Sequence, residues 1–168
     1  MLRGRSVTLR PVTDADVSAL AAIRAAPEVR RWWRGGDDLA AAVRADLADD
    51  DLTVYAIEHD GRVVGAIQWF EESDPDYRHA ALDIFLDPAV HGAGLGGDAV
   101  RTLARHLIDE HGHHRLTIDP AAANTPAIRA YAKVGFRPVG ILRRYERGAD
   151  GRWQDGLLMD LLADELAD

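Results

Sequence analysis

Hydrophobic and polar positions along this chain follow two periods, and these predict a mixture of strands and helices. Alternating or continuous apolar runs are typical of strands, and apolar positions three or four residues apart are typical of helices. The expected strands cover residues 7–10, 52–58, 63–70, 81–86, 115–118, 136–145 and 153–162. The expected helices cover residues 13–25, residues 38–48, a segment ending near 110, and the segment between Asn124 and Gly135.

Short local signals mark the ends of these elements. Asp60-Gly61 is typical of a two-residue hairpin turn, and Pro27 is expected to end the first helix. Asn124 is a favoured residue at a helix start, and Gly135 is a favoured residue just past a helix end. Antiparallel strands come first and alternating strands and helices follow, which predicts a mixed α/β (α+β) sheet protein.

Composition limits the possible classes of function. The chain has 168 residues, 47% of them hydrophobic, so we expect one domain over residues 1–168. It has no cysteine, which excludes disulfides, thiolate metal sites and an acyl-cysteine intermediate. The net charge of −8 disfavours nucleic acid and membrane partners and suits a cationic substrate, although it also serves solubility alone. No leader or membrane-spanning run is apparent, so we expect a cytoplasmic protein.

The most informative segment is His91-Gly92-Ala93-Gly94-Leu95-Gly96-Gly97, between an expected strand and an expected helix. Four glycines in the six residues 92–97 leave backbone N–H groups unshielded at the positive end of a helix dipole. Such an arrangement binds phosphate or pyrophosphate.

A dinucleotide is one candidate ligand, because Gly92-x-Gly94-x-x-Gly97 matches the dinucleotide fingerprint and Asp119 ends the next strand. However, residues 87–91 separate the strand from the first glycine, where the fingerprint needs a tight turn. The residues after Asp119, about 50 in number, are also too few for the remaining sheet and a substrate domain. We therefore favour another phosphate-bearing ligand.

A second motif, Asn124-x-x-Ala127-x-x-x-Tyr131-x-Lys133-x-Gly135-Phe136, follows His91-x-x-Gly94-x-Gly96 at a distance of about thirty residues. Together the two motifs resemble the GNAT superfamily of N-acetyltransferases. The first motif of that family begins with Gln or Arg, so we expect an altered phosphate contact at His91. The resemblance implies a mostly antiparallel sheet of about seven strands with about four helices, splayed apart at an acetyl-CoA site.

The resemblance implies acetyl-CoA as co-substrate and no metal. The pyrophosphate would lie on the amides of the glycine-rich loop, and the pantetheine arm would run like a strand beside residues 84–86. The implied acetyl-CoA-binding residues are Ile84, Phe85, Leu86, His91, Gly92, Ala93, Gly94, Leu95, Gly96, Gly97 and Asn124. Asn124 would hold the pantetheine amide, and it also suits a plain helix cap.

Further segments are similar to the aminoglycoside 6′-N-acetyltransferases, a branch of this superfamily. They are residues 7–10, residues 29–36, Asp83, and residues 117–120. The resemblance implies that Trp32, Trp33, Asp83 and Asp119 bind the substrate. A polycation with sugar rings needs spaced carboxylates and flat apolar surfaces. The ordinary alternatives are a core position for the tryptophans, a partner such as Arg78 or His79 for Asp83, and a turn for Asp119.

The implied reaction is direct transfer of the acetyl group to a primary amine, the 6′-amine, in a ternary complex, which would confer antibiotic resistance. Asp83 would orient the amine and accept its proton, directly or through a water. Tyr131 would protonate or hydrogen-bond the departing thiolate, although a half-buried core tyrosine is its ordinary alternative.

Other acceptors fit the same coenzyme motifs: a polyamine, a kasugamycin-type aminoglycoside or a protein N-terminus. A regulatory domain that binds acetyl-CoA without turnover is the alternative outside the enzymes. The histidines His106, His111, His113 and His114 lack matching carboxylates, so we expect no metal there. The oligomeric state, monomer or homodimer, stays open.

Overall fold

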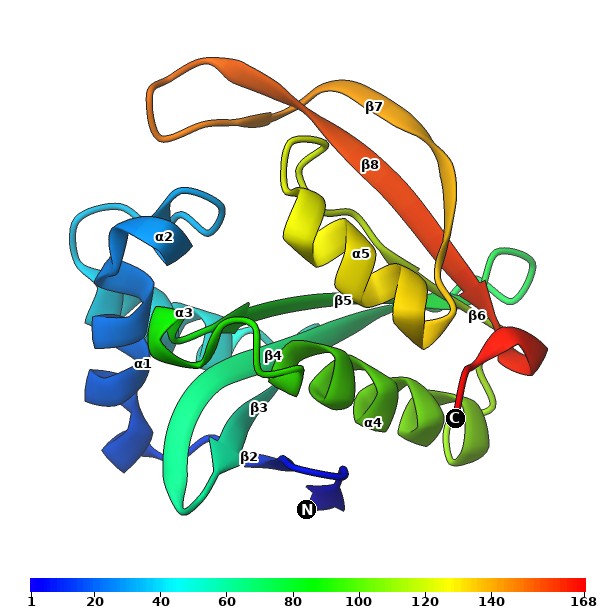
Figure 1. Ribbon diagram of the computed structural model, residues 1–168, viewed down its shortest axis with the longest axis horizontal. Coiled ribbons are helices and arrows are strands. Elements are labelled where there is room, and N and C mark those ends of the chain that lie inside the picture. Colours follow the sequence, from blue (N-terminus) through cyan, green and yellow to red (C-terminus); the bar gives the residue numbers. More distant parts are fainter.

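A computed structural model describes residues 1–168 as one mixed, eight-stranded sheet with five α-helices (Figure 1). The strand order is β1-β2-β3-β4-β5-β6-β8-β7, and every neighbouring pair is antiparallel except β5–β6. The strands are β1 (Leu2–Arg3), β2 (Thr8–Pro11), β3 (Thr53–His59), β4 (Arg62–Glu72), β5 (His79–Leu86), β6 (Arg115–Ile118), β7 (Arg137–Arg147) and β8 (Trp153–Leu162). The helices are α1 (Val17–Ala25), α2 (Pro27–Arg30), α3 (Leu39–Ala48), α4 (Leu95–Asp109) and α5 (Thr125–Val134).

The expected elements are all present. The structure adds β1 and α2, which have two and four residues and are too short to create a periodic pattern. The turn at Asp60-Gly61 has left-handed backbone at both residues (φ 48° and 74°), as a tight hairpin requires. The side chain of Asn124 accepts from the Ala127 amide at the start of α5, and Gly135 ends that helix with φ 122°.

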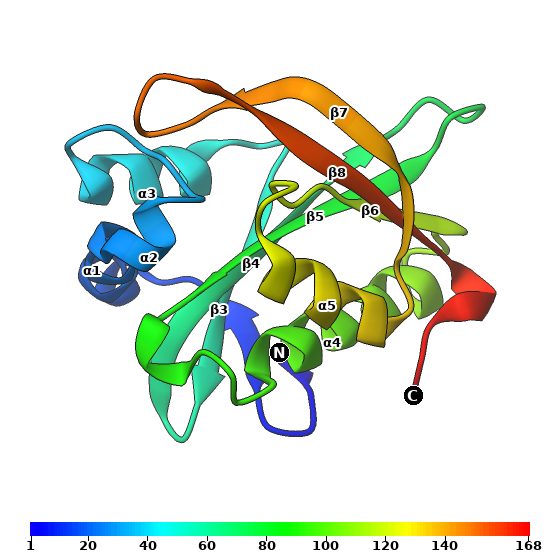
Figure 2. The same ribbon diagram turned by 45° about the horizontal axis from the view of Figure 1, so that its top comes forward.

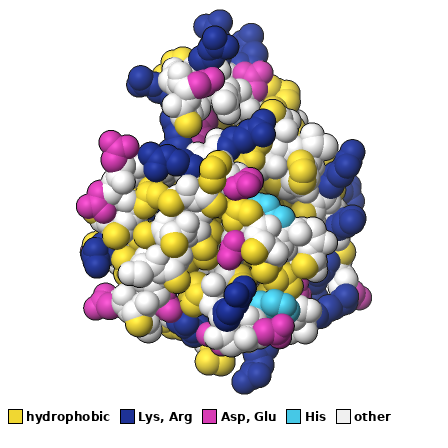
Figure 3. All heavy atoms as spheres, turned by 60° about the vertical axis from the view of Figure 1, so that its left-hand side comes forward, with side chains coloured by type: hydrophobic (Ala, Val, Ile, Leu, Met, Phe, Trp, Pro, Cys, Tyr) yellow, Lys and Arg dark blue, Asp and Glu magenta, His cyan; other side chains and the backbone are white.

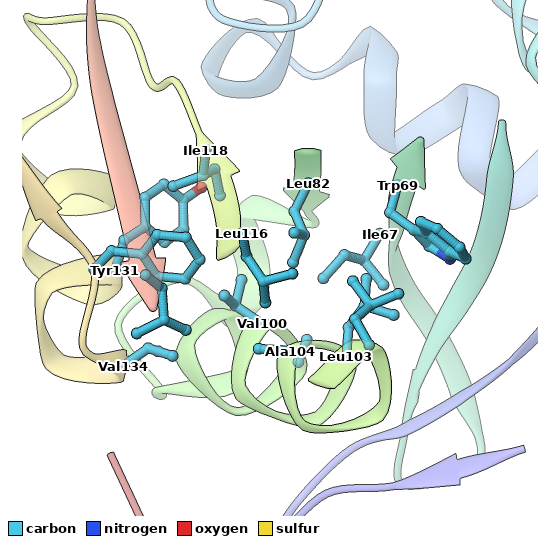
Figure 4. Packing of buried hydrophobic residues seen from close by; sticks show 14 of the residues in the cluster. Ile67, Trp69, Leu82, Val100, Leu103, Ala104, Leu116, Ile118, Tyr131 and Val134 are labelled. Carbon is cyan, nitrogen blue, oxygen red and sulfur yellow. The ribbon is translucent and has the colours of Figure 1, made fainter. Parts of the chain in front are cut away.

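The two faces of the sheet carry separate apolar clusters. Helices α4 and α5 cover one face, where Leu82, Leu103 and Leu116 belong to a core of 21 buried residues (Figure 4). Helices α1 to α3 lie on the other side, where a smaller cluster of seven buried residues includes Phe85. Side chains alternate between faces along a strand, so Leu82 packs under α4 while Asp83 and Phe85 point toward α1–α3.

The parallel pair β5–β6 is short and then diverges. It pairs only Ala80 with Leu116 and Ala81 with Thr117. Beyond this point β5 continues to Leu86 and pairs with β4 alone. One edge of β5 from Leu82 to Leu86 is therefore without a strand partner. This is the splay that the family resemblance implies.

The last two strands form a long hairpin, here called the β7–β8 arm. It projects beyond the sheet and passes over the α2–α3 region, as both views show (Figures 1 and 2). The pairing of β7 with β8 shifts between Leu142 and Glu146, and Arg144 in this interval has φ 48°. The arm therefore bends over the splayed part of the sheet. No helix has the length and apolar composition needed to cross a membrane.

Candidate functional site

The glycine-rich loop ends in the N-terminus of α4. Gly92 and Gly94 have φ of 81° and 80°, a left-handed conformation that favours glycine. The Asp98 amide makes the first bond of the helix, to the Gly94 carbonyl, so the amides of residues 95–97 precede the helical ladder. A Cβ on Gly96 would lie 3.2 Å from the Leu86 side chain, so glycine lets the helix start pack against the end of β5.

His91 folds back onto the end of β5. A ring nitrogen, Nε2, lies 3.0 Å from the Leu86 carbonyl, and the imidazole is exposed. The carbonyl accepts this bond, so Nε2 carries the proton and Nδ1 remains free of protein partners. A histidine at this position thus orders the loop through Leu86 and leaves one ring nitrogen for other contacts.

Residues of α5 face the splay from the opposite side. Asn124 caps the helix through a long bond of 3.4 Å to the Ala127 amide, and its side-chain NH₂ donates no hydrogen bond within the protein. Tyr131 is 8% exposed and packs among core residues close to Ile118 (Figure 4). Burial, together with the carboxylates of Asp83 and Asp119, raises the pKa of the Tyr131 phenol above its usual value. Tyr131 therefore holds its proton at neutral pH.

Asp83 has no cationic partner. Its carboxylate accepts only the amide of Ile84, at 3.0 Å. Arg78 instead pairs with Glu71, and His79 bonds the Tyr77 carbonyl, so the ordinary alternative for Asp83 does not occur. The side chain is exposed to solvent, but only within a cleft whose walls surround the carboxylate. Partial loss of solvent inside the cleft, with repulsion from Asp119, raises the pKa of Asp83 from 3.8 to about 8.

Asp119 follows β6 on the far side of the splay. Its carboxylate accepts a hydrogen bond from the Tyr145 hydroxyl of the β7–β8 arm. Burial raises the pKa of Asp119, while the Tyr145 bond opposes the rise. The same bond is the main reason that the pKa of Tyr145 rises to about 12. The charge of Asp119 thus acts on Asp83, although Asp119 does not line the same hollow.

A hollow of about 290 Å³ brings Asp83, Trp32 and Trp33 together. Figure 3 shows the side of the molecule on which this hollow lies, below the end of the β7–β8 arm. Several Lys or Arg side chains gather at the end of the arm in this view. The Trp33 ring packs edge-on against Phe85, with centroids 4.9 Å apart, while Trp32 lies under the Arg31 guanidinium at 4.5 Å. The tryptophans are both half-buried, so neither is a plain core residue.

Sequence reasoning missed other residues around this hollow: Arg24, Arg34, Asp46, Gln68 and Glu146. Asp46 lies on the polar face of α3 and Glu146 near the end of a strand, positions that ordinarily face solvent. The one signal in the sequence was Arg24, a charged residue within the apolar pattern of α1. It is 3% exposed and pairs with Asp46 at 2.8 Å.

A larger hollow of about 660 Å³ lies elsewhere, between the N-terminal residues and the outer side of α4. It contains none of the expected catalytic or substrate-binding residues. The histidines near the end of α4 lie close together, with Nε2 of His106 and His111 3.3 Å apart. No three His, Cys, Asp or Glu side chains come together in an arrangement that would hold a metal ion.

Comparison with known proteins identifies the family. Residues 6–137 match the model of the acetyltransferase (GNAT) domain. The aminoglycoside N(6′)-acetyltransferase type 1 of Klebsiella pneumoniae is 32% identical over 156 residues, covering 80% of this chain and 76% of that protein. The N-alpha-acetyltransferase RimI of Mycobacterium tuberculosis is 31% identical over 150 residues, covering 86% of this chain and 88% of that protein.

A solved structure of AAC(6′)-Ib in complex with paromomycin and acetyl-CoA superposes with a TM-score of 0.78 and 26% identity, covering 95% of each chain. The fold expected from the two motifs is thereby confirmed, including a mostly antiparallel sheet with flanking helices. The chain belongs to the GNAT family of acetyltransferases.

Proposed function

We propose that this acetyltransferase moves the acetyl group of acetyl-CoA to the 6′-amine of an aminoglycoside, in a ternary complex. The observation that carries the proposal is Asp83, an unpaired carboxylate that opens into a tryptophan-lined cleft. It lies on the strand whose one edge has no partner beyond Ala81. A cationic amine and an extended ligand would meet at this residue.

The residues present fit acetyl-CoA on both sides of the splay. The amides of residues 95–97 and the left-handed glycines offer a cradle for the pyrophosphate. Along the free edge of β5 the backbone groups of Ile84 and Leu86 can meet an extended pantetheine arm, whereas the Phe85 carbonyl points to Gly65 of β4. The side-chain NH₂ of Asn124 is free to donate to the same arm. Acetyl-CoA supplies a thioester whose carbonyl carbon accepts attack by an amine.

The acceptor side suits a cation with sugar rings. Asp83, Trp32 and Trp33 line the hollow and supply a carboxylate and aromatic surface, and Asp119 adds a second carboxylate close enough to affect Asp83. An ammonium ion that enters the cleft relieves the repulsion between the carboxylates and restores the ionised form of Asp83. Binding of the cation is therefore coupled to release of a proton.

Asp83 takes the proton that the substrate ammonium must lose, directly or through a water. The bound ammonium lowers the pKa of Asp83 from its raised value in the free enzyme, so passage of the proton through a water is favoured over direct transfer. The amine nitrogen then bonds to the acetyl carbon and the carbon–sulfur bond breaks. Backbone groups of residues 84–86 polarise the carbonyl, and the Tyr131 hydroxyl gives a proton or a hydrogen bond to the leaving sulfur.

A protein N-terminal amine is the second candidate acceptor, supported by the similarity to RimI over most of the chain. The arginines around the mouth of the cleft would suit acidic residues near such a terminus. A polycation carries no acidic group to meet them, so the two classes of acceptor are separable by their charge.

The test measures thiol release from acetyl-CoA with kanamycin, tobramycin, kasugamycin, spermidine and a short peptide as acceptors. The chain has no cysteine, so the background of protein thiol is absent. The proposal is supported if kanamycin and tobramycin alone are acetylated and if Asp83→Asn loses this turnover. Its cellular role is supported if expression of the protein raises the aminoglycoside resistance of a susceptible bacterium. Preferred turnover of spermidine or the peptide refutes the aminoglycoside assignment, and acetyl-CoA binding without any turnover refutes the enzyme.

A further inference from the structure

Arg34 spans the mouth of the cleft. It lies in the loop between α2 and α3, and its guanidinium reaches the β7–β8 arm on the other side. Nη2 is 3.8 Å from Glu146 Oε1, and Nη1 donates to the Gly148 carbonyl at 3.3 Å. The loop and the arm approach one another in both ribbon views (Figures 1 and 2). One side chain therefore bridges two elements that are more than a hundred residues apart in sequence.

The backbone of Arg34 is held firmly, whereas its tip is not. Its carbonyl accepts a 2.8 Å bond from the buried Arg24, which pairs with Asp46 through its other nitrogen. The two contacts of the guanidinium are longer, and the side chains of Arg34 and Glu146 are 35% and 44% exposed. Partly exposed ion pairs add little stability. The side chain can therefore leave the arm without unfolding the loop that carries it.

Glu146 belongs to the same hollow as Asp83. In the absence of substrate its carboxylate is neutralised by Arg34, a cation that the protein itself provides. A substrate with one ammonium group can satisfy Asp83 but brings nothing to replace the guanidinium at Glu146. A substrate with a second ammonium group can make the exchange.

We propose that Arg34 is a specificity-determining gate, which closes the mouth of the cleft on Glu146 and is displaced by a second cationic group of the substrate. The selected substrate class is then amines with at least two positive charges. This inference rests on the proposed acetyl transfer, and it narrows the acceptor without depending on the aminoglycoside assignment. It makes Arg34 a competitor of the substrate and not a contact for it.

Kinetic measurements with kanamycin and spermidine test the exchange. Arg34→Ala should lower KM for both polycations by roughly three- to tenfold with kcat unchanged, because Glu146 is then vacant. In the Glu146→Gln background the same substitution should leave KM unchanged. Arg147→Ala, which removes an exposed arginine of β7 that forms no ion pair, is the matched control and should have no effect. The proposal is overturned if Arg34→Ala leaves KM unchanged or raises it. It is also overturned if KM falls equally when Arg34→Ala is made in the Glu146→Gln background, or if KM falls equally in Arg147→Ala.

A distance measurement keeps the gate testable if neither polycation is acetylated. Because the chain has no cysteine, Asp37→Cys and Ala149→Cys place two spin labels at exposed positions on the loop and the arm. The loop stays held by Arg24, so release of Arg34 frees the arm alone. Addition of spermidine should therefore lengthen or broaden the distance distribution, methylamine should not, and Arg34→Ala should be broad without ligand. The gate is overturned if spermidine and Arg34→Ala both leave the distance distribution unchanged. The proposed function is refuted by a different result, the absence of turnover in the acetylation assay.

Discussion

The hydroxyl of Tyr145 in β7 donates a hydrogen bond to the carboxylate of Asp119 at the end of β6. Strands β6 and β7 are not neighbours in the sheet, since β8 lies between them. The bond ties the β7–β8 arm to the edge of the splay. It also holds Asp119 nearer to its ionised form, against the effect of burial on its pKa.

Tyr145→Phe should weaken the amine site. Loss of a hydrogen bond to a carboxylate lets burial raise the pKa of Asp119 further, so less of it is ionised. We expect KM for the amine to rise by roughly fivefold, corresponding to about 1 kcal/mol, with a larger effect at pH 6 than at pH 8. Steady-state kinetics at the two pH values measure this, and an effect independent of pH would contradict the account of Asp119.

The rate should depend on pH through Asp83. Asp83 must be ionised in the free enzyme before it can accept a proton from the substrate. We therefore expect kcat/KM to rise about tenfold per pH unit below 8 and to level off above it. Asp83→Asn should abolish most of the activity, and any residual rate should lack this inflection. A wild-type profile that is flat between pH 6 and 8 would show that Asp83 is already ionised.

The same carboxyl should affect stability in the opposite direction. Its pKa in the folded state lies above the unfolded value of 3.8, so the folded protein binds the additional proton between these values. The contribution of Asp83 to folding therefore falls as pH rises toward 8. Asp83→Asn should raise Tm at pH 9 more than at pH 5, measured by thermal unfolding, and an equal change at both would contradict the shift.

Tyr131→Phe should separate catalysis from packing. The ring remains to fill the core beside Phe136, so Tm should change little. Loss of the hydroxyl should reduce kcat by about tenfold or more while the Kd for acetyl-CoA stays constant. Calorimetric titration alongside turnover separates the two effects, and a normal kcat would remove Tyr131 from the chemistry.

Gly94→Asp should abolish acetyl-CoA binding, because it places a negative charge beside the pyrophosphate cradle. It also forces a side chain into left-handed backbone, at a cost of about 1–3 kcal/mol. Gly61→Asp is the matched control: Gly61 has φ 74°, and like Gly94 it has open space where a Cβ would stand. Tm should fall by a similar amount in both variants, and only Gly94→Asp should lose acetyl-CoA binding in a calorimetric titration. Normal binding by Gly94→Asp would move the pyrophosphate elsewhere.

The sequence predicts the elements of this fold well where the signals are local. The hairpin turn at Asp60, the cap at Asn124 and the glycine at Gly135 each fix their backbone through nearest neighbours. The motif around His91 predicts the loop and the start of α4. Such features need no knowledge of distant residues.

The acceptor side of the cleft is less predictable, because distant segments build it. Asp46 and Glu146 have the sequence context of solvated charges, and only the bend of the β7–β8 arm brings Glu146 toward α3. Arg34 reaches the arm across 114 positions of sequence, a contact that no periodic pattern encodes. Charges on opposite lips of a cleft are visible only after the strand order is known.

The divergence of β5 and β6 makes resistance to unfolding depend on a short stretch of the sheet. Two residue pairs of a single parallel ladder join one half of the sheet to the other. A ligand that lies along the free edge of β5 would act as a temporary ninth strand and strengthen that joint. By mass action, the ligand would then protect the folded chain in proportion to the logarithm of its concentration, once sites are saturated. Resistance to proteolysis would thus increase with the concentration of the acetyl donor.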